Sequence, residues 1–340
     1  MMTNENTILI WGAGAIGGTL GAYWARAGED VLLVDIVQEH VDAVNRDGLS
    51  IEGPVEAFTQ KLRAVLPQDV QGQYRRIILA VKAHHTQDAV RALKAHLAEG
   101  GSVLSAQNGL NELVIAQEIG RERTVGCFVN FGADWLEPGR ILFGNRAAVA
   151  VGELDGSLSA RAQDYLRLLQ IFDPGAVITP NIWGYLWGKL GYGAILFATA
   201  LTNASMSDNL ASERHFPIYH RLGREVMAVA RARGVQPLGF NGFDPAAFMP
   251  EADEAAARRS VADMAEFNRH TAKTHSGIWR DLAVRKRKTE VDAQIAIIAP
   301  LGTDAGVPTP TLQKLVSLIH DIEEGQREQS WATLDLLLAP

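Results

Sequence analysis

The chain has 340 residues, 47% of them hydrophobic and 21% charged, with a formal net charge of −7 at pH 7. These values are typical of a globular protein long enough for two domains, each with its own core. The acidic balance excludes the basic surface of a nucleic-acid-binding protein, and no uninterrupted apolar stretch reaches the ~18 residues of a membrane-spanning helix. The polar N-terminal segment does not resemble a signal peptide, and a single cysteine, Cys127, permits no disulfide within the chain. We therefore expect a cytoplasmic protein without nucleic-acid or membrane partners.

The most informative motif follows the first predicted strand, residues 7–11. It reads Gly12-Ala13-Gly14-Ala15-Ile16-Gly17, a G-x-G-x-x-G pattern that leads into a predicted helix over residues 19–27. Strand, glycines and helix in this order are typical of dinucleotide-binding βαβ units. Gly12 permits the turn, Gly14 lets a pyrophosphate approach the backbone, and Gly17 lets the helix pack close to the sheet. We expect the free N–H groups at the helix start, including those of Ala15 and Ile16, to bind the pyrophosphate.

Asp35 is the predicted determinant of cofactor choice. It ends the second apolar run, residues 31–34, and lies 18 positions after Gly17. An acid at this spacing typically accepts hydrogen bonds from the adenosine ribose, and its charge repels a 2′-phosphate. The sequence therefore predicts NAD rather than NADP, unless Asp35 rotates away or Arg26 or Arg46 reaches the phosphate.

Strand and helix patterns alternate through the first half of the chain, which favours a doubly wound, mainly parallel α/β sheet of the Rossmann type. The further strands are predicted at residues 31–35, 77–81, 102–106 and 125–130, and helices at 86–99, 111–120 and 161–171. Residues 58–64 are an additional predicted strand. Residues 140–143 and 147–151 are predicted to form a hairpin around Gly144-Asn145-Arg146.

The second half of the chain is predicted to be all helical. Helices are expected at residues 183–201, 211–233, 254–271, 289–299 and 309–324, with Pro217 breaking or kinking the second. We therefore predict a dinucleotide-binding domain over residues 1–180 and a helical substrate and dimerisation domain over 181–340. The apolar segments 295–301 and 312–319 carry more hydrophobic positions than one core-facing stripe needs, which predicts self-association.

Polar residues that follow the predicted strands indicate a ligand-binding cleft that they line, because ligands bind beyond the carboxyl ends of parallel strands. Lys82, the triplet Gln107-Asn108-Gly109 and Asn130 each follow a predicted strand. In the helical half, Lys189 has apolar neighbours. It either reaches the surface along its helix or is buried with a lowered pKa that suits acid–base chemistry.

Two further features have simpler interpretations than catalysis. Cys127 lies in an apolar run and is predicted to be a core residue. His84 and His85 are loop residues beside the cleft rather than metal ligands, since no acid or cysteine accompanies them at a useful spacing. We expect no metal site.

The order of these motifs resembles the ketopantoate reductase (2-dehydropantoate 2-reductase) family over nearly the whole chain. The resemblance rests on the glycine motif, Val81-Lys82, Gln107-Asn108-Gly109, Trp187-x-Lys189-Leu190, Asp281 and Lys288-Thr289-Glu290-Val291-Asp292. It implies a Rossmann domain and a helical domain of the 6-phosphogluconate-dehydrogenase-like type. It also implies reduction of a 2-keto acid by a nicotinamide cofactor, as in pantothenate biosynthesis, and a homodimer.

The resemblance also implies roles for individual residues. Lys189 matches the catalytic general acid, and Glu290 matches the acid that holds the substrate hydroxyl and tunes that lysine. Asn108 matches an asparagine near nicotinamide and substrate, Ser276 a serine that contacts the substrate carboxylate, and Lys82 a lysine at the cofactor edge. His275, Trp279 and Arg280 are further candidates beside Ser276.

Two departures from the family pattern leave alternatives open. The family usually has asparagines one and two turns after the catalytic lysine, where this chain has Gly193 and Phe197. Thr199 or Thr202 would substitute if the alignment shifts. NADPH-using members tend to have a basic residue after the second strand, where this chain has Asp35.

The missing asparagines raise two alternatives to a ketopantoate reductase. With Phe197 and Trp279 they favour a bulkier substrate, as in the family's mandelate-type dehydrogenases. They also leave open a non-catalytic dinucleotide sensor, although such a protein would need neither Lys189 nor Glu290.

Overall fold

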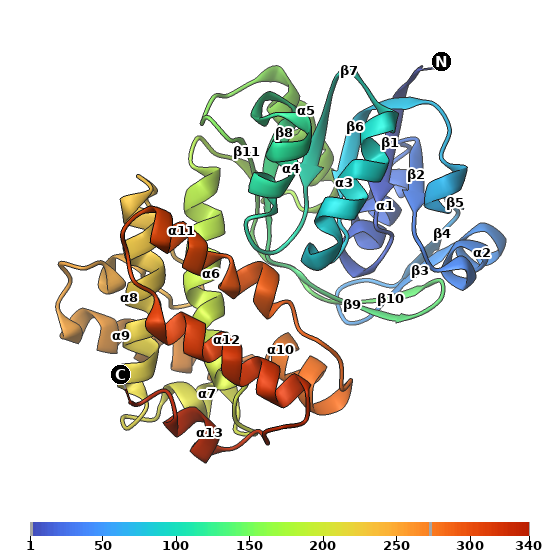
Figure 1. Cartoon of the computed structure of the whole chain (residues 1–340). Coiled ribbons are helices and arrows are strands. Elements are labelled where there is room, and N and C mark those ends of the chain that lie inside the picture. Colours follow the sequence, from blue (N-terminus) through green and yellow to red (C-terminus); the bar gives the residue numbers. More distant parts are fainter. Residues whose placement is uncertain (1–2, 272–273, 340) are drawn as a thin grey trace. The chain divides into compact units, whose positions relative to one another are not determined.

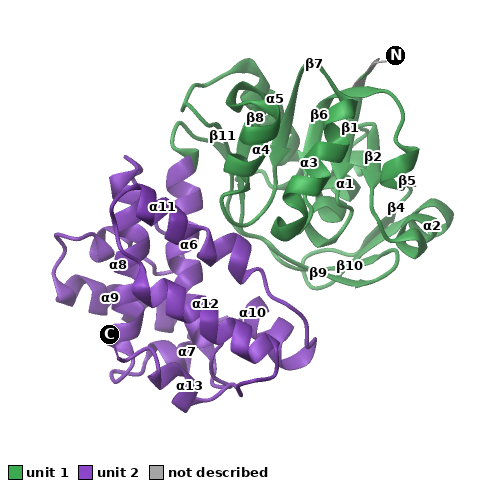
Figure 2. Ribbon diagram, in the orientation of Figure 1, with its two compact units in different colours: residues 1–182 green, residues 183–340 purple. Residues whose placement is uncertain are grey.

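The computed structural model describes residues 3–271 and 274–339, and the chain divides into two compact units, residues 1–182 and 183–340 (Figures 1 and 2). The first unit is built on an eight-stranded sheet in the order β12-β11-β8-β7-β6-β1-β2-β5. All its neighbouring strands are parallel except β8 and β11. The strands are β1 (Thr3–Trp11), β2 (Val31–Val34), β5 (Arg63–Val65), β6 (Gln73–Leu79), β7 (Leu97–Ser105), β8 (Thr124–Val129), β11 (Val149–Glu153) and β12 (Val177–Ile178).

Helices cover both faces of this sheet, and alternate side chains of each buried strand pack against one face or the other. Ile8 and Ile10 of β1 lie in one core cluster with side chains of α1 (Ala15–Arg26) and α5 (Ala160–Phe172). Leu9 and Trp11 lie in the other, with α3 (Thr86–Leu93) and α4 (Asn111–Ile119), the two helices labelled over the sheet in Figure 1. Successive strand side chains point to opposite faces, so both faces need cover. The predicted doubly wound Rossmann fold is confirmed, and Cys127 is a fully buried core residue.

A second, four-stranded sheet in this unit corrects two sequence expectations. Its order is β4-β3-β10-β9, with β3 (Leu49–Glu52), β4 (Phe58–Gln60), β9 (Gly132–Glu137) and β10 (Arg140–Asn145). The expected hairpin of residues 140–151 is wrong, because β10 pairs with β9 while β11 joins the large sheet beside β8. The segment 58–64 is not one strand but β4 and β5, which belong to different sheets.

The second unit is helical, as predicted. Its helices are α6 (Ile182–Thr199), α7 (Met206–Leu210), α8 (Phe216–Ala232), α9 (Glu254–Arg269), α10 (Gly277–Trp279), α11 (Ile298–Asp304), α12 (Pro310–Glu323) and α13 (Trp331–Asp335). The helix expected over 211–233 begins only at Phe216, so the predicted break near Pro217 is confirmed; the proline lies in the first turn of α8, where it costs no hydrogen bond. The expected helix over 289–299 is instead a π-helical turn, Asp292–Ala296, followed by α11.

Glycines let other segments pack closely on α6. A Cβ at Gly188 would lie 1.9 Å from the Leu238 carbonyl oxygen, and one at Gly191 would lie 2.7 Å from Met227 Cε and Phe243 Cζ. The Leu238 amide also donates to the Gly184 carbonyl oxygen at 2.8 Å. The glycines therefore bring the segment around Leu238 and Phe243 against the helix that carries Lys189.

Most of the apolar positions expected to form a self-association surface are used inside this unit, whereas Ile297, Leu301 and Val316 are partly exposed. Ile295, Ile298, Leu312, Leu315 and Ile319 are each at most 1% exposed. They therefore do not require a partner chain. In the part of the chain that the structure describes, no helix combines the length and apolar character needed to cross a membrane.

Candidate active site

The glycine-rich loop has the geometry of a phosphate cradle. Gly12 has φ +103°, and a Cβ there would lie 2.7 Å from the Val81 amide nitrogen. A Cβ at Gly17 would lie 2.1 Å from the Gly12 carbonyl oxygen and 2.9 Å from Ile10 Cγ2, so any side chain would push α1 off the sheet. Gly14 is the N-cap of α1 and makes no side-chain hydrogen bond, and the first turn holds no acid. The N–H groups of Ala15 and Ile16 thus begin a helix whose positive end no side chain caps, which suits an anion.

Asp35 follows β2 and is fixed by two backbone amides. Its Oδ2 accepts a hydrogen bond from Ala13 N at 3.0 Å, and its Oδ1 accepts one from Val37 N at 3.0 Å. The next side chain, Ile36, is 73% exposed. Each carboxylate oxygen has a second lone pair for a ribose hydroxyl.

Both arginines that sequence reasoning considered for a 2′-phosphate have other acidic partners. Arg26 Nη1 lies 2.6 Å from Glu56 Oε1, and the Glu56 hydrogen bond raises the pKa of Arg26. Arg46 Nη2 lies 2.7 Å from Asp47 Oδ2. Recruiting either arginine for a phosphate would break an existing ion pair.

The parallel register brings Lys82 and Asn108 to the edge that also carries the glycine loop. Trp11 of β1 pairs with Leu79 of β6, and Leu79 pairs with Ser105 of β7. Residues that follow these strands therefore emerge side by side. Lys82 and Asn108 are both partly buried.

A hydrogen-bond network that sequence reasoning missed holds this edge together. Gln107 Nε2 donates to the Val81 carbonyl oxygen and to Thr86 Oγ1, both at 2.8 Å. Thr86 Oγ1 donates to Asn111 Oδ1 at 2.8 Å, and Asn111 Nδ2 donates to the Asn108 carbonyl oxygen at 2.7 Å. The network connects the loop after β6 to the turn that carries Asn108. Thr86 and Asn111 lie at helix starts, where polar residues are common as caps, so no sequence signal separates them from ordinary helix termini.

In the helical unit, Lys189 is partly buried on α6, which is compatible both with a side chain that reaches the surface along its helix and with a buried one. Gly193 lies one turn further along the same face. Among the described residues, no atom outside its own helix lies within 4 Å of the position that a Cβ of Gly193 would take. The helix therefore has open space next to Lys189. Phe197, which was expected to line a substrate pocket, is fully buried instead.

Glu290 is partly buried in a segment whose flanking residues are anchored to α12. Thr289 donates from its amide and its hydroxyl to Glu323 Oε1, both at 2.7 Å. Asp292 Oδ1 lies 2.9 Å from His320 Nε2. Glu290 Oε2 accepts from Gln294 Nε2 at 3.4 Å. Two π-helical turns, Arg280–Val284 and Asp292–Ala296, flank the segment, and such turns occur frequently at functional sites.

The remaining predicted substrate residues have local hydrogen-bonding roles. Ser276 is 3% exposed and caps α10, its Oγ accepting from Trp279 N at 3.1 Å. Thr199 is also 3% exposed, and its hydroxyl donates to the Leu196 carbonyl oxygen at 2.8 Å. Thr202 is fully buried and bonds Asn209. Contact of Ser276 or Thr199 with substrate stays a prediction.

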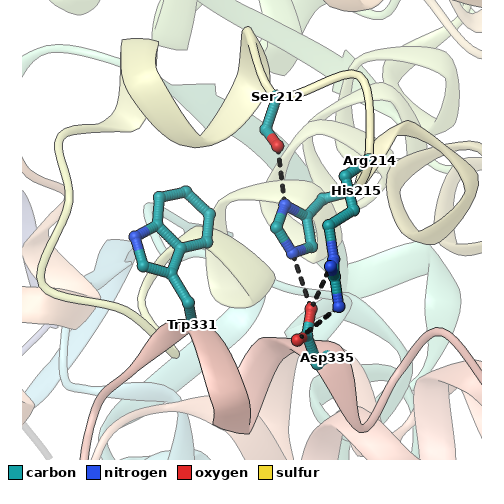
Figure 3. A pocket seen from close by; sticks show the side chains of 5 residues that line it. All are labelled: Ser212, Arg214, His215, Trp331 and Asp335. Carbon is teal, nitrogen blue, oxygen red and sulfur yellow. Dashed lines mark hydrogen bonds and ion pairs between the residues drawn. The ribbon is translucent and has the colours of Figure 1, made fainter.

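A pocket of about 270 Å³ elsewhere in the helical unit contains none of the predicted site residues (Figure 3). Ser212 Oγ lies 2.7 Å from His215 Nδ1, and His215 Nε2 lies 2.9 Å from Asp335 Oδ1. The His215 and Arg214 hydrogen bonds lower the pKa of Asp335. Trp331 stacks on the His215 ring, which is buried, with centroids 4.9 Å apart. These contacts attach α13 to the start of α8. Within residues 3–271 and 274–339, no cluster of three or more His, Cys, Asp or Glu suits a metal ion.

Comparisons with known proteins identify the family of the chain. The ketopantoate reductase PanE/ApbA family model matches residues 8–156, and the model of its C-terminal domain matches 181–323. A 2-dehydropantoate 2-reductase of Mesorhizobium japonicum is 26% identical, covering 92% of this chain and 96% of the relative. One of Archaeoglobus fulgidus is 25% identical, covering 94% and 98%.

Solved structures include proteins of the same fold. A PanE/ApbA family ketopantoate reductase from Ralstonia eutropha has a TM-score of 0.78 at 26% identity, covering 94% of this chain and 99% of that one. A D-mandelate dehydrogenase solved with NADH and anilino(oxo)acetate has a TM-score of 0.80 at 22% identity, covering 94% and 98%. The chain therefore belongs to the ketopantoate reductase family of oxidoreductases.

Proposed function

We propose that this protein is an NAD-dependent oxidoreductase that interconverts a 2-keto acid and a 2-hydroxy acid. The observation that carries the proposal is the shared sheet edge, where the open start of α1, Asp35, Lys82 and Asn108 lie beside one another. The residues fit a dinucleotide, because a pyrophosphate needs free N–H groups and the ribose needs an acceptor. Lys82 and Asn108 then lie toward the nicotinamide and the substrate.

The preference for NAD over NADP rests on the fixed position of Asp35. Its two backbone hydrogen bonds oppose rotation away from the ribose. A carboxylate about 4 Å from a 2′-phosphate costs roughly 1 to 4 kcal/mol, depending on the effective dielectric. We therefore expect about fivefold to several-hundredfold tighter binding of NADH than of NADPH.

The chain's own residues supply the acid–base chemistry. When bound, the nicotinamide provides the hydride. The substrate carbonyl oxygen gains negative charge as its carbon is reduced, so a cation that also donates a proton lowers the barrier. Lys189 takes this role, and Glu290 holds the resulting hydroxyl and orients the lysine. Asn108 and Ser276 orient the substrate, with Thr199 as a further contact.

The substrate is ketopantoate or a bulkier 2-keto acid, and the structure favours the second. Gly193 leaves open space one turn from Lys189, where the family has an asparagine. The D-mandelate dehydrogenase of similar fold was solved with NADH and an aromatic ligand. The absence of the asparagine also motivates a non-catalytic sensor, but such a protein would not need Lys189 and Glu290.

The test compares kcat/KM for ketopantoate with aromatic and branched 2-keto acids, each with NADH and with NADPH. Oxidation of either cofactor with any acid rejects the sensor. A clear preference for ketopantoate rejects the bulkier substrate. We further propose a cytoplasmic homodimer, and a monomeric mass by light scattering at micromolar concentration would contradict the dimer.

A further inference from the structure

The peptide groups of Ala13, in the middle of the glycine-rich loop, are held on both sides. The Ala13 amide donates to Asp35 Oδ2 at 3.0 Å. The Ala13 carbonyl oxygen lies 2.9 Å from Nε2 of His40, a residue of α2 (Gln38–Asp47) that is 1% exposed. The loop between β1 and α1 thus has a second, buried anchor besides the predicted acid.

The contacts of His40 define its tautomer. Nδ1 accepts a hydrogen bond from the Gly139 amide at 3.0 Å, and the Trp135 indole nitrogen lies 3.4 Å from the same atom. Both neighbours are donors, so Nδ1 carries no proton. Nε2 must then carry the proton and donate it to the Ala13 carbonyl oxygen. The neutral ring satisfies one buried carbonyl and one buried amide at the same time.

Gly139 belongs to the turn between β9 and β10, so the ring connects two distant parts of the unit. The turn needs glycine, because its φ is +77° and a Cβ would lie 3.1 Å from the Ala43 Cβ. The same hairpin also meets the start of α1, since a Cβ at Gly18 would lie 2.5 Å from Ile141 Cδ1. The small sheet therefore packs against the loop and first turn that are to hold the pyrophosphate.

We propose that His40 is a positioning residue for dinucleotide binding, which fixes the Ala13 peptide against the β9–β10 turn and so presets the glycine-rich loop. This inference rests on the proposed function, because it concerns the same cofactor. Removing the ring leaves the Ala13 carbonyl and the Gly139 amide without their partner, and the loop can leave the geometry that the pyrophosphate needs. His40 touches no reacting atom, so its effect falls on cofactor affinity rather than on the chemical step.

The test measures NADH dissociation constants and kcat at saturating NADH for two variants. His40→Phe keeps a ring but removes both hydrogen bonds. His40→Gln offers an amide NH2 donor and a carbonyl oxygen acceptor in place of the two ring nitrogens. We expect the phenylalanine variant to weaken NADH binding about tenfold. We expect the glutamine variant to recover most of the affinity, and both to keep kcat within about twofold.

The control is His96→Phe, which removes a histidine of the same unit whose Nδ1 lies 3.0 Å from the Gly72 carbonyl oxygen. It should leave NADH affinity unchanged. Wild-type affinity in folded His40→Phe, or equal losses in the Phe and Gln variants, would overturn the inference. If wild type binds neither NADH nor NADPH, the proposed function fails first, and the inference fails with it.

Hydrogen exchange in the wild type provides a test that does not depend on a variant that folds. NADH binding should slow exchange of the Gly139 amide, because a loop held by cofactor holds His40 and the turn with it. An unchanged exchange rate at Gly139, with NADH bound, would overturn the inference on its own.

Discussion

The Asp35 carboxylate accepts a hydrogen bond from the Ala13 amide at 3.0 Å, which joins the end of β2 to the glycine-rich loop. Asp35, the proposed acceptor for the ribose hydroxyls, is therefore held by the loop that is proposed to bind the pyrophosphate. Ribose binding by Asp35 and pyrophosphate binding by the glycine-rich loop therefore depend on one contact. A change at Asp35 or at Ala13 should affect both kinds of binding.

The first prediction concerns Asp35→Ala. We expect the ratio of NADPH to NADH dissociation constants to fall toward one, because the variant loses a ribose acceptor and the repulsion of a 2′-phosphate. Both constants are measured by titration of the same preparation. Asp69→Ala, at an exposed acid, is the control. Tighter NADPH than NADH binding in the wild type would show that Asp35 does not govern the choice.

The second prediction concerns Lys189→Ala. Loss of a general acid should lower kcat by at least ~10²-fold, while the NADH dissociation constant stays within about twofold, since the cofactor residues lie in the first unit. Lys314→Ala, on α12 of the same unit, should keep wild-type turnover. Retained turnover in the Lys189 variant would remove this lysine from the chemistry.

The third prediction concerns the open space at Gly193. Gly193→Asn adds a polar side chain where no atom outside its own helix lies within 4 Å of the Cβ position. We expect kcat/KM for an aromatic 2-keto acid to fall about tenfold or more, relative to kcat/KM for ketopantoate, because the added amide takes space from the larger substrate. An unchanged ratio would mean that the face of α6 after Lys189 does not contact the substrate side chain.

The fourth prediction concerns Glu112, a buried acid in the first turn of α4. Its carboxylate oxygens have no hydrogen-bond partner among the described residues. Burial raises its pKa from 4.5 to about 8, because the charged carboxylate loses its hydration. Between these two pKa values the folded protein keeps the proton that the unfolded chain has lost, so stability falls as pH rises through this window.

Glu112→Gln removes this pH dependence, because the amide is neutral throughout. The variant should match wild type near pH 4.5 and exceed its free energy of unfolding above pH 8 by on the order of 2 to 4 kcal/mol. Urea unfolding from pH 4.5 to 9 measures the difference. Parallel stability curves for the two proteins would contradict a protonated Glu112.

Sequence patterns located the carboxyl ends of β1, β2, β6, β7 and β8 to within two residues, because those strands are buried on both faces, but they missed β12 and placed the starts of β1, β6 and β7 four or five residues too late. Runs such as residues 31–34 and 77–79 are therefore continuously apolar. The small sheet was not predicted as a sheet, since its short strands are half exposed, and the assignment of β10 to a hairpin with β11 failed. Pairing partners depend on tertiary packing that a local pattern does not encode.

The same distinction applies to the candidate site. Asp35, Lys82 and Asn108 follow buried strands and were proposed from that position. His40 was not found, because it lies in a mostly polar helix that the sequence did not predict, and two of its partners are backbone groups 27 and 99 residues away. Phe197 was not recognised as a core residue because it lies in an almost wholly apolar helix, where the sequence does not separate a side chain that lines a pocket from one that fills the core.

The most direct test of the account measures oxidation of NADH and of NADPH by the wild-type protein with a panel of aromatic, branched and ketopantoate-type 2-keto acids. We expect turnover with at least one acid, a higher kcat/KM with NADH than with NADPH, and a preference for a bulky side chain. Failure to oxidise either cofactor with any 2-keto acid would contradict the central claim.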